Sequence, residues 1–97
     1  MLPSPKETIV LELLSGGGNM YGLEMVKAAD GALRRGTVYV LLDRMEEKGF
    51  VVSSAEREEG LAGMPRRRYR LTGLGQRALR ARQSAYAVLS GPILAGG

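Results

Sequence analysis

The sequence predicts a mainly α-helical fold with a small β-hairpin, a winged helix-turn-helix followed by a C-terminal dimerisation helix. Two observations predict this fold class. Apolar residues recur at the spacing of amphipathic helices in four segments, and most of these segments are bounded by capping residues or glycine. Between the third and fourth segments lie two short runs that have the composition and alternation of strands. The 97 residues suffice for one small domain with a modest core.

The first helix is predicted to begin at Pro5 and to end before the glycine run at residues 16–18. Ser4 can cap this helix, and Glu7 stands three residues after Ser4, which is the spacing of a capping box. Proline suits the first helical position, where its missing N–H has no partner to lose. The expected apolar face consists of Ile9, Val10, Leu13 and Leu14.

A second helix is predicted over about residues 20–29, with Asn19 as its cap. Gly22 inside this helix costs about 1 kcal/mol relative to alanine, and the close approach of another helix is a plausible reason for it. Tyr21 can either touch a DNA phosphate or pack against the first helix, and packing is the favoured interpretation.

A third helix is predicted over residues 37–48, ending at Gly49. Its apolar face follows the i, i+3, i+4, i+7 spacing of a helix and consists of Val38, Leu41, Leu42 and Met45. The pair Arg34 and Arg35 precedes it. By itself, this segment fits an ordinary amphipathic surface helix as well as it fits a helix that reads DNA.

Two strands are predicted over residues 51–55 and 66–71, joined by an acidic, glycine-rich loop. In the second strand, the two-residue period puts Tyr69 and Leu71 on one face, and Arg68 and Arg70 on the other. The hairpin is the expected wing.

Thr72 can cap a last helix over residues 73–90, which Gly91 and Pro92 stop. This helix has more apolar surface than one small core is expected to cover, so a partner helix in a symmetric homodimer is the favoured cover. The alternative is that the helix folds back on its own domain. We therefore expect a DNA-binding domain over residues 1–72 and a dimerisation helix with its tail over residues 73–97. The expected dimer contacts are Leu74, Ala78, Leu79, Ala85, Tyr86 and Leu89.

The composition excludes several kinds of site. The chain has no cysteine and no histidine, so zinc sites and Ser-His or Cys-His catalysis are excluded. No nucleophile has a base beside it in the sequence. We expect neither an enzyme nor a cofactor or metal site. The apolar run near the N-terminus is too short for a signal peptide or a membrane span, which favours a cytoplasmic protein without a membrane partner.

The charge distribution predicts a nucleic-acid partner. Residues 66–82 contain seven arginines and no acid, and such a concentrated basic segment favours a polyanion such as double-stranded DNA. In a winged helix-turn-helix, the third helix enters the major groove. Arg44 can bind guanine O6 and N7 together, and Val40 can pack on a thymine methyl group. The residues expected to contact DNA are Arg34, Arg35, Thr37, Val40, Arg44, Arg66, Arg67, Arg68 and Arg70.

Three motifs resemble those of PadR-like transcriptional regulators. Residues 36–51, GTVYVLLDRMEEKGFV, resemble the family signature GTLYxxLxRLEKxGLV. Residues 68–72, RYRLT, followed by Gly75, are similar to YRLTxxG, and residues 21–25 are similar to HGYEI. The resemblance covers about residues 6–82. It implies that Tyr39 lies near the DNA backbone, and that the protein is a dimeric repressor, relieved in some members by a small aromatic or drug-like ligand.

The sequence departs from the family pattern at several positions. Tyr21 and Leu23 replace the usual histidine and tyrosine of HGYEI, and Val40 stands where proline is common. The end at residue 97 suggests a short form with one C-terminal helix. Because the chain has no tryptophan and one phenylalanine, it gives little support to an aromatic stacking pocket between subunits.

We therefore expect a sequence-specific DNA-binding transcriptional regulator, mainly a repressor, that acts as a homodimer on a roughly palindromic operator. A small-molecule effector remains an open possibility that the sequence does not identify. The alternative function is that of a winged-helix protein-interaction module, which binds another regulator or a polymerase subunit through its arginines.

Overall fold

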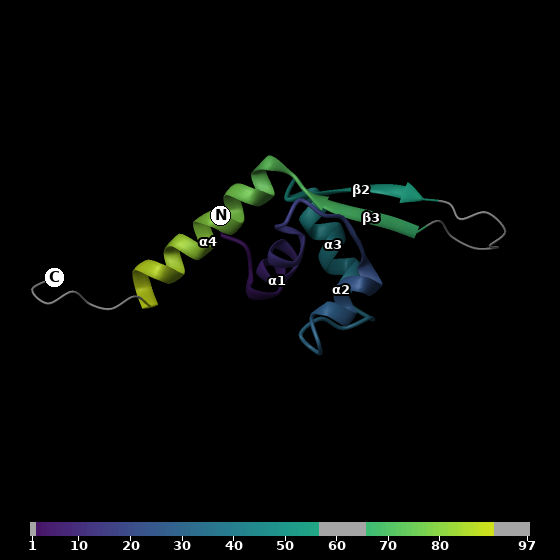
Figure 1. The fold of residues 1–97 in the computed structure, drawn as a ribbon, viewed down its shortest axis with the longest axis horizontal. Coiled ribbons are helices and arrows are strands. Elements are labelled where there is room, and N and C mark those ends of the chain that lie inside the picture. Colours follow the sequence, from purple (N-terminus) through teal and green to yellow (C-terminus); the bar gives the residue numbers. More distant parts are fainter. Residues whose placement is uncertain (1, 57–65, 91–97) are drawn as a thin grey trace, which may run out of the picture.

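The structure is a computed structural model that describes residues 2–56 and 66–90. Three helices lie on one side of a small antiparallel sheet, and a fourth helix leaves the end of the sheet and extends away from it (Figure 1). The strand order in the sheet is β1-β3-β2. In chain order, the elements are α1 (Pro5–Leu14), β1 (Met20–Tyr21), α2 (Gly22–Ala28), α3 (Val38–Glu47), β2 (Val51–Glu56), β3 (Arg66–Leu71) and α4 (Gly73–Ser90). These elements confirm the predicted winged helix-turn-helix.

Helix α1 begins with the predicted capping box. The Glu7 backbone N–H donates to Ser4 Oγ over 3.2 Å, and the Ser4 N–H donates to Glu7 Oε1 over 2.8 Å. The buried face of α1 differs slightly from the prediction. Leu11 is fully buried together with Val10 and Leu14, whereas Ile9 and Leu13 are partly buried. Because α1 contacts α2, α3, α4 and β3, more than one side of the helix is covered.

Glu7 also forms an ion pair that links α1 to Lys48 at the end of α3. Its Oε2 accepts a hydrogen bond from Lys48 Nζ over 2.7 Å, and the Glu7 side chain is 3% exposed. Burial alone would raise the pKa of Glu7, but the hydrogen bonds from Lys48 and Ser4 outweigh it and hold the pKa below its usual value.

The predicted second helix begins later than expected, because Met20 and Tyr21 form a strand. This strand, β1, pairs antiparallel with β3, Met20 opposite Tyr69 and Tyr21 opposite Arg68. The prediction of Asn19 as the helix cap is wrong. Tyr21 precedes the helix, and its backbone N–H donates to Glu24 Oε1 over 2.8 Å. The strand depends on a partner far along the chain, so local capping signals gave no sign of it.

Gly22 is buried where α2 meets α3. A Cβ atom at this position would lie 2.8 Å from Cε1 of Tyr39, closer than carbon atoms can approach. The predicted close contact with another helix is therefore present, and the ring of Tyr39 makes it.

Helix α3 follows its predicted pattern. Val38, Leu42 and Met45 are buried in the core, and Leu41 is partly buried. Gly49, with φ +81°, follows the end of the helix, in the left-handed region that favours glycine. The apolar face of α3 is thus held against the domain, and its opposite face is free to contact a partner.

The predicted hairpin is also present. β2 and β3 pair antiparallel from Val51 opposite Leu71 to Glu56 opposite Arg66. Strand β3 has its predicted bounds, and β2 is one residue longer than predicted. The remainder of the predicted loop, residues 57–65, lies outside the described residues. Tyr69 is 2% exposed and turns toward the helices, whereas Arg70 is exposed.

Helix α4 begins at the predicted cap, since Thr72 Oγ1 accepts a hydrogen bond from the Gly75 N–H over 2.9 Å. Gly75 allows α4 to cross the chain closely, because a Cβ atom there would lie 2.1 Å from the carbonyl oxygen of Phe50. Among the described helices, α4 included, none is long and apolar enough to cross a membrane.

The two halves of α4 differ in their surroundings. Ala78 and Leu79 are buried in the protomer's own core, so their assignment to a free dimer-forming face is corrected. They pack on the domain because α4 runs beside α1 in its first turns. In the second half, Tyr86 is 70% exposed and Leu89 is 85% exposed. The alternative prediction, that this helix folds back on its own domain, is therefore correct for the first half of α4 only.

Candidate nucleic-acid interface

The outward face of α3 carries the residues predicted to read DNA. Tyr39 and Val40 are about half exposed, and Asp43 and Arg44 are exposed. Across residues 2–56 and 66–90, no acidic side chain, the neighbouring Asp43 included, lies within ion-pair distance of Arg44. The guanidinium of Arg44 is therefore available for a base or a phosphate.

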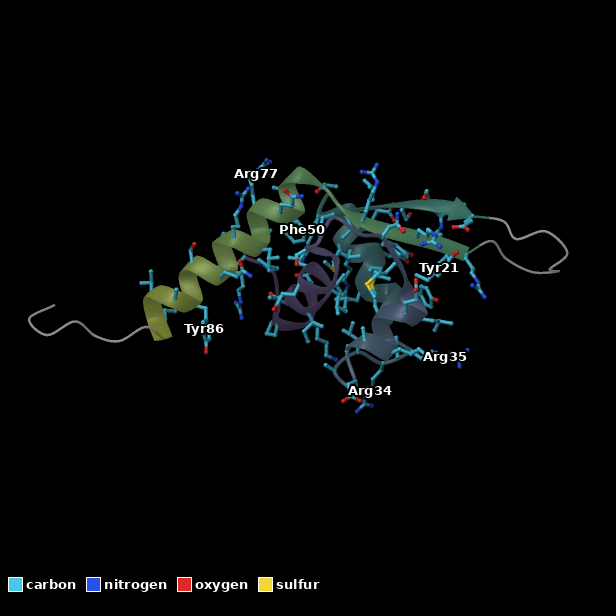
Figure 2. All side chains as sticks on the ribbon, in the orientation of Figure 1. Tyr21, Arg34, Arg35, Phe50, Arg77 and Tyr86 are labelled. Atoms are coloured by element: carbon cyan, nitrogen blue, oxygen red, sulfur yellow. The ribbon has the colours of Figure 1, made fainter. Side chains whose placement is uncertain are left out.

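The start of α3 is suited to an anion. Arg34 and Arg35 project from the loop before the helix, on the side of the molecule away from α4 (Figure 2). Thr37 Oγ1 donates to the Arg34 carbonyl oxygen over 3.4 Å, and Thr37 makes no side-chain cap for α3. The Val38 N–H donates to the Arg34 carbonyl oxygen over 2.9 Å. Among the described residues, the N–H groups of Tyr39 and Val40 are therefore the ones without an acceptor at the start of α3, and such N–H groups favour phosphate.

The four arginines of β3 have different environments. Arg70 is exposed on the outer face of the hairpin. Arg67 is exposed, and its Nη1 donates to Ser53 Oγ over 3.1 Å; the Ser53 hydroxyl in turn donates to Glu46 of α3 over 2.8 Å. The guanidinium of Arg66 lies 5.2 Å from the centre of the Tyr21 ring, within range of a cation–π contact.

Arg68 is engaged within the protomer. Its guanidinium lies 4.2 Å from the centre of the Tyr21 ring. Its Nε donates to Glu56 Oε2 over 2.6 Å, and its Nη1 donates to Asn19 Oδ1 over 2.8 Å. The hydrogen bond from Arg68 lowers the pKa of Glu56. Arg68 therefore joins β1, β2 and β3, and a DNA contact by this side chain would require it to leave these partners.

Tyr21 packs within the protein, as the sequence favoured, but its ring contacts the arginines of β3. Its ring supports the arginines of β3 on the outer face of the sheet. The expected packing against α1 was thus incorrect in its partner, because Tyr21 belongs to β1 and not to the second helix.

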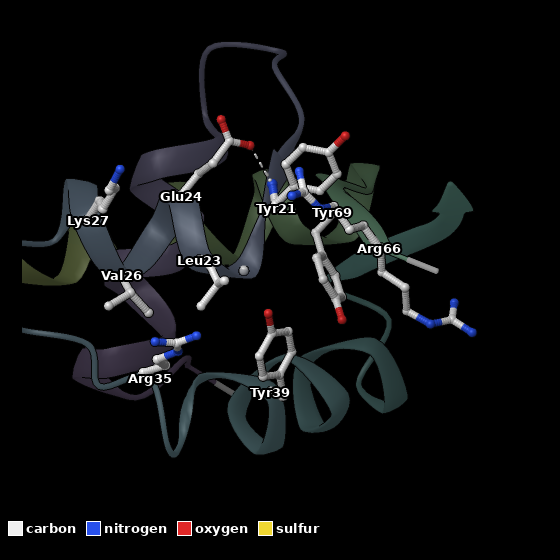
Figure 3. A pocket seen from close by; sticks show the side chains of 11 residues that line it. Tyr21, Leu23, Glu24, Val26, Lys27, Arg35, Tyr39, Arg66 and Tyr69 are labelled. Carbon is white, nitrogen blue, oxygen red and sulfur yellow. Dashed lines mark hydrogen bonds between the residues drawn. The ribbon is translucent and has the colours of Figure 1, made fainter. Parts of the chain in front are cut away.

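Sequence reasoning missed a groove of about 720 Å³ beside this surface (Figure 3). Residues from β1, α2, the loop before α3, the start of α3 and β3 line it, and we call it the α2–α3–β3 groove. Lys27 is one of its cations, although the sequence gave it no role. Four predicted DNA contacts, Arg35, Tyr39, Arg66 and Arg67, also line the groove, which no pattern within a single element could show.

The predicted dimer contacts lie in several settings. Leu74 is 42% exposed near the start of α4, Ala85 is partly buried, and Tyr86 and Leu89 are exposed in the second half. Tyr86 projects away from the rest of the protomer in Figure 2. Val88, which the sequence analysis omitted, is 82% exposed. Three large apolar side chains are thus uncovered near the end of the described helix.

A helix pair that presents α3, with a hairpin wing beside it, defines a winged helix-turn-helix protein of the DNA-binding class. The chain belongs to the transcriptional regulator PadR-like family, whose model matches residues 10–81. The predicted family is therefore confirmed, and the protein is a transcriptional regulator. Because this family consists of transcription regulators, the expectation that the protein is not an enzyme is also confirmed.

Solved structures of the family resemble this chain closely in fold. A PadR family transcription regulator from Clostridium difficile is 26% identical, with a TM-score of 0.73 over 89% of this chain and 91% of that one. A PadR family transcriptional regulator from Eggerthella lenta is 32% identical, with a TM-score of 0.70 over 84% of this chain and 74% of that one. No curated protein matches the chain at a significant level.

Proposed function

We propose that this regulator is a repressor, which acts as a cytoplasmic homodimer on a roughly palindromic operator. The observation that carries the proposal is the outward face of α3. It presents Tyr39, Val40 and Arg44, which is unpaired among the described residues, with a basic loop before the helix and the arginine-bearing wing beside it. Base contacts would come from the exposed line of Thr37, Val40 and Arg44, and phosphate contacts from Tyr39, Arg34, Arg35 and the exposed arginines of β3.

The second half of α4 supports the homodimer. Tyr86, Val88 and Leu89 are the most exposed large apolar residues among those that the structure describes, and water is a poor solvent for such a cluster. Two copies that pair along the side of α4 shared by Tyr86 and Leu89 would bury these two side chains, whereas Val88, two positions after Tyr86, lies on nearly the opposite side of the helix. A two-fold dimer also explains why the operator would be roughly palindromic, because each α3 would read one half-site.

Fluorescence anisotropy with the upstream region of the protein's own gene tests the proposal. We expect that region to bind more tightly than a random duplex of equal length, with log affinity falling by about 0.9 per phosphate contact for each unit of log salt. Transcription from that promoter in vitro should fall when the protein is added. Equal affinity for both duplexes would refute sequence-specific binding. Capture of a regulator or polymerase subunit in equal amounts, without duplex binding, would favour the protein-interaction module.

A further inference from the structure

Three side chains form a chain of hydrogen bonds from α3 to both strands of the wing. The Ser53 hydroxyl of β2 donates to Glu46 Oε2 of α3 over 2.8 Å, and the Ser53 N–H donates to the same oxygen over 3.2 Å. Arg67 Nη1 of β3 donates to the Ser53 hydroxyl over 3.1 Å. The chain therefore connects the helix expected to read bases with the hairpin expected to contact phosphates.

Strand alternation puts Arg67 on the side of the hairpin that faces the helices. Successive side chains of a strand point to opposite faces, so Arg67 shares the face of the buried Tyr69, and the other three arginines of β3 share the opposite face. The register places Ser53 opposite Tyr69, which brings the Ser53 hydroxyl to the same face. Arg67 is therefore the arginine of β3 whose side chain starts beside α3.

The single proton of the Ser53 hydroxyl determines how Arg67 is held. A hydroxyl group has one proton to donate and two lone pairs that accept. Because this proton goes to the Glu46 carboxylate, a lone pair of the oxygen is left for Arg67. Hydrogen bonds in such a chain polarise and strengthen one another, and charged groups stand at both of its ends. The carboxylate of Glu46 thus acts on Arg67 through Ser53.

Most of the Arg67 guanidinium is still available to a ligand. Its Nη1 donates to Ser53, and its Nε and Nη2 donate to no other residue that the structure describes. Arg67 is exposed, and it lines the α2–α3–β3 groove together with Arg35 and Tyr39, which are expected to contact phosphates. A side chain that is already held at one nitrogen loses less freedom when the others bind a phosphate, so it binds more tightly.

The acids of α3 that face the hairpin need a role other than contact with DNA. Burial and the negative charges of Asp43 and Glu46 raise the pKa of Tyr69, whereas the positive charge of Arg67 lowers it. These three charges therefore lie near the same ring, on the side of α3 beside the wing. A carboxylate close to a duplex repels the phosphates, so Glu46 by itself would weaken binding.

We propose that Glu46 and Ser53 are positioning residues, which hold Arg67 between α3 and the wing so that it binds an operator phosphate. The proposal rests on the proposed function, because the ligand is the operator. Neither Glu46 nor Ser53 touches the duplex. Since Glu46 belongs to α3, the phosphate bound at Arg67 is kept in a fixed position relative to the bases that α3 contacts.

The direction of the change in duplex affinity tests Glu46. Loss of a carboxylate near a polyanion by itself strengthens binding, because a repulsion is removed. Glu46→Ala should instead weaken binding to the upstream region about three- to tenfold, since Arg67 is no longer held. Glu47→Ala is the matched control, because it removes the same charge from the next, exposed residue, and it should bind at least as tightly as the unaltered protein. If Glu46→Ala binds as tightly as Glu47→Ala, Glu46 does not position Arg67.

Removal and restoration of one hydroxyl group test Ser53. Ser53→Ala should weaken duplex binding about three- to tenfold, and Ser53→Thr, which keeps the hydroxyl, should restore most of it. Ser54→Ala is the matched control, since Ser54 is exposed and points to the opposite face of β2. In a chain that already carries Arg67→Gln, Ser53→Ala should cause no further loss, because both changes remove the same contact. Additive losses would show that Ser53 does not act through Arg67.

Nuclear magnetic resonance on the full chain without DNA tests the hold on Arg67 separately. The ¹⁵N heteronuclear NOE of the Arg67 Nε–H should fall in Ser53→Ala to the value of the exposed Arg70, and should not change in Ser54→Ala. Circular dichroism must show that each variant is folded. An Arg67 value that is equal in Ser53→Ala and the unaltered protein would refute the positioning. If the unaltered protein binds no duplex, the proposed function fails and the phosphate contact fails with it, whereas the NOE still decides whether Ser53 holds Arg67.

Discussion

Arg68 and Arg70 are two residues apart on one strand and have opposite environments. Arg68 contacts the Tyr21 ring, Glu56 and Asn19, whereas Arg70 is exposed. Because cross-strand contacts hold Arg68, its first effect is on the position of the wing and β1. Arg70 is free to contact a phosphate.

We therefore expect different results from Arg68→Gln and Arg70→Gln. Arg68→Gln should speed amide hydrogen exchange at Met20 and Tyr21, because β1 loses a fastening contact with the hairpin. Arg70→Gln should leave this exchange unchanged and reduce the salt slope of duplex binding by about 1, the value for one lost phosphate contact. Equal exchange rates in the two variants would show that Arg68 does not fasten β1.

Arg44 is expected to read a base because it is exposed on α3 and unpaired among the described residues. Arg44→Ala should cost about 1–3 kcal/mol of binding at one base position and relax specificity there. Competition binding with operators substituted at each position measures this. A uniform loss across all sequences would instead identify Arg44 as a phosphate contact.

Glu7 makes the stability of the fold depend on pH. Its pKa is lower in the folded protein than its usual value near 4.5, so its contribution is present above that value and is lost as pH falls through the folded pKa. Glu7→Gln should lower the free energy of unfolding at pH 7 by about 1–2 kcal/mol, since one hydrogen bond to a charged group is lost and Lys48 is partly exposed. Urea unfolding at pH 7 and pH 3 measures both effects. The difference between variant and unaltered protein should shrink at pH 3, and an equal difference at both pH values would contradict this role.

At the scale of elements, Gly75 allows the start of α4 to lie close to the backbone of Phe50. Gly75→Ala should destabilise the fold by about 1–3 kcal/mol, because the added methyl group meets the Phe50 carbonyl oxygen. Gly73→Ala is the matched control, since its Cβ atom would be 3.5 Å from the movable Arg77 side chain. Thermal unfolding compares the two variants. Equal melting temperatures would show that α4 can shift without cost.

The second half of α4 is the proposed dimer contact. Leu89→Glu should convert the dimer to a monomer and weaken operator binding, because it puts a charge into an apolar interface. Gln83→Glu adds the same charge at an exposed position of the same helix and should leave the dimer intact. Sedimentation measures both variants. An unchanged dimer in Leu89→Glu would refute this contact.

At the scale of the molecule, the two proposed surfaces lie apart. The exposed half of α4 extends away from the three helices and the sheet (Figure 1). Pairing through these halves would leave the outer faces of both α3 helices uncovered. The geometry therefore allows one molecule to form a dimer and bind an operator at the same time.

The sequence by itself determined the helices α1 and α3, the strand β3 and the start of α4. Their signals are local: the Ser4–Glu7 capping box, the apolar spacing that ends at Gly49, the alternation in residues 66–71, and the Thr72 cap. Such signals act between residues a few positions apart, so they can be recognised without knowing the fold. Two of the three family motifs, residues 36–51 and 68–72, overlap these segments, whereas residues 21–25 lie in β1 and α2.

Only the tertiary structure decided β1, the engagement of Arg68, the division of α4 and the groove. The contact between Arg68 and Asn19 spans 49 positions of the chain. Strand β1 forms because its backbone pairs with β3, which lies far along the chain. Ala78 and Leu79 have the same apolar character as Leu89, and burial against the protomer's own core separates them. These features depend on which distant segments meet in space, and that information is absent from the spacing of residues within any one segment.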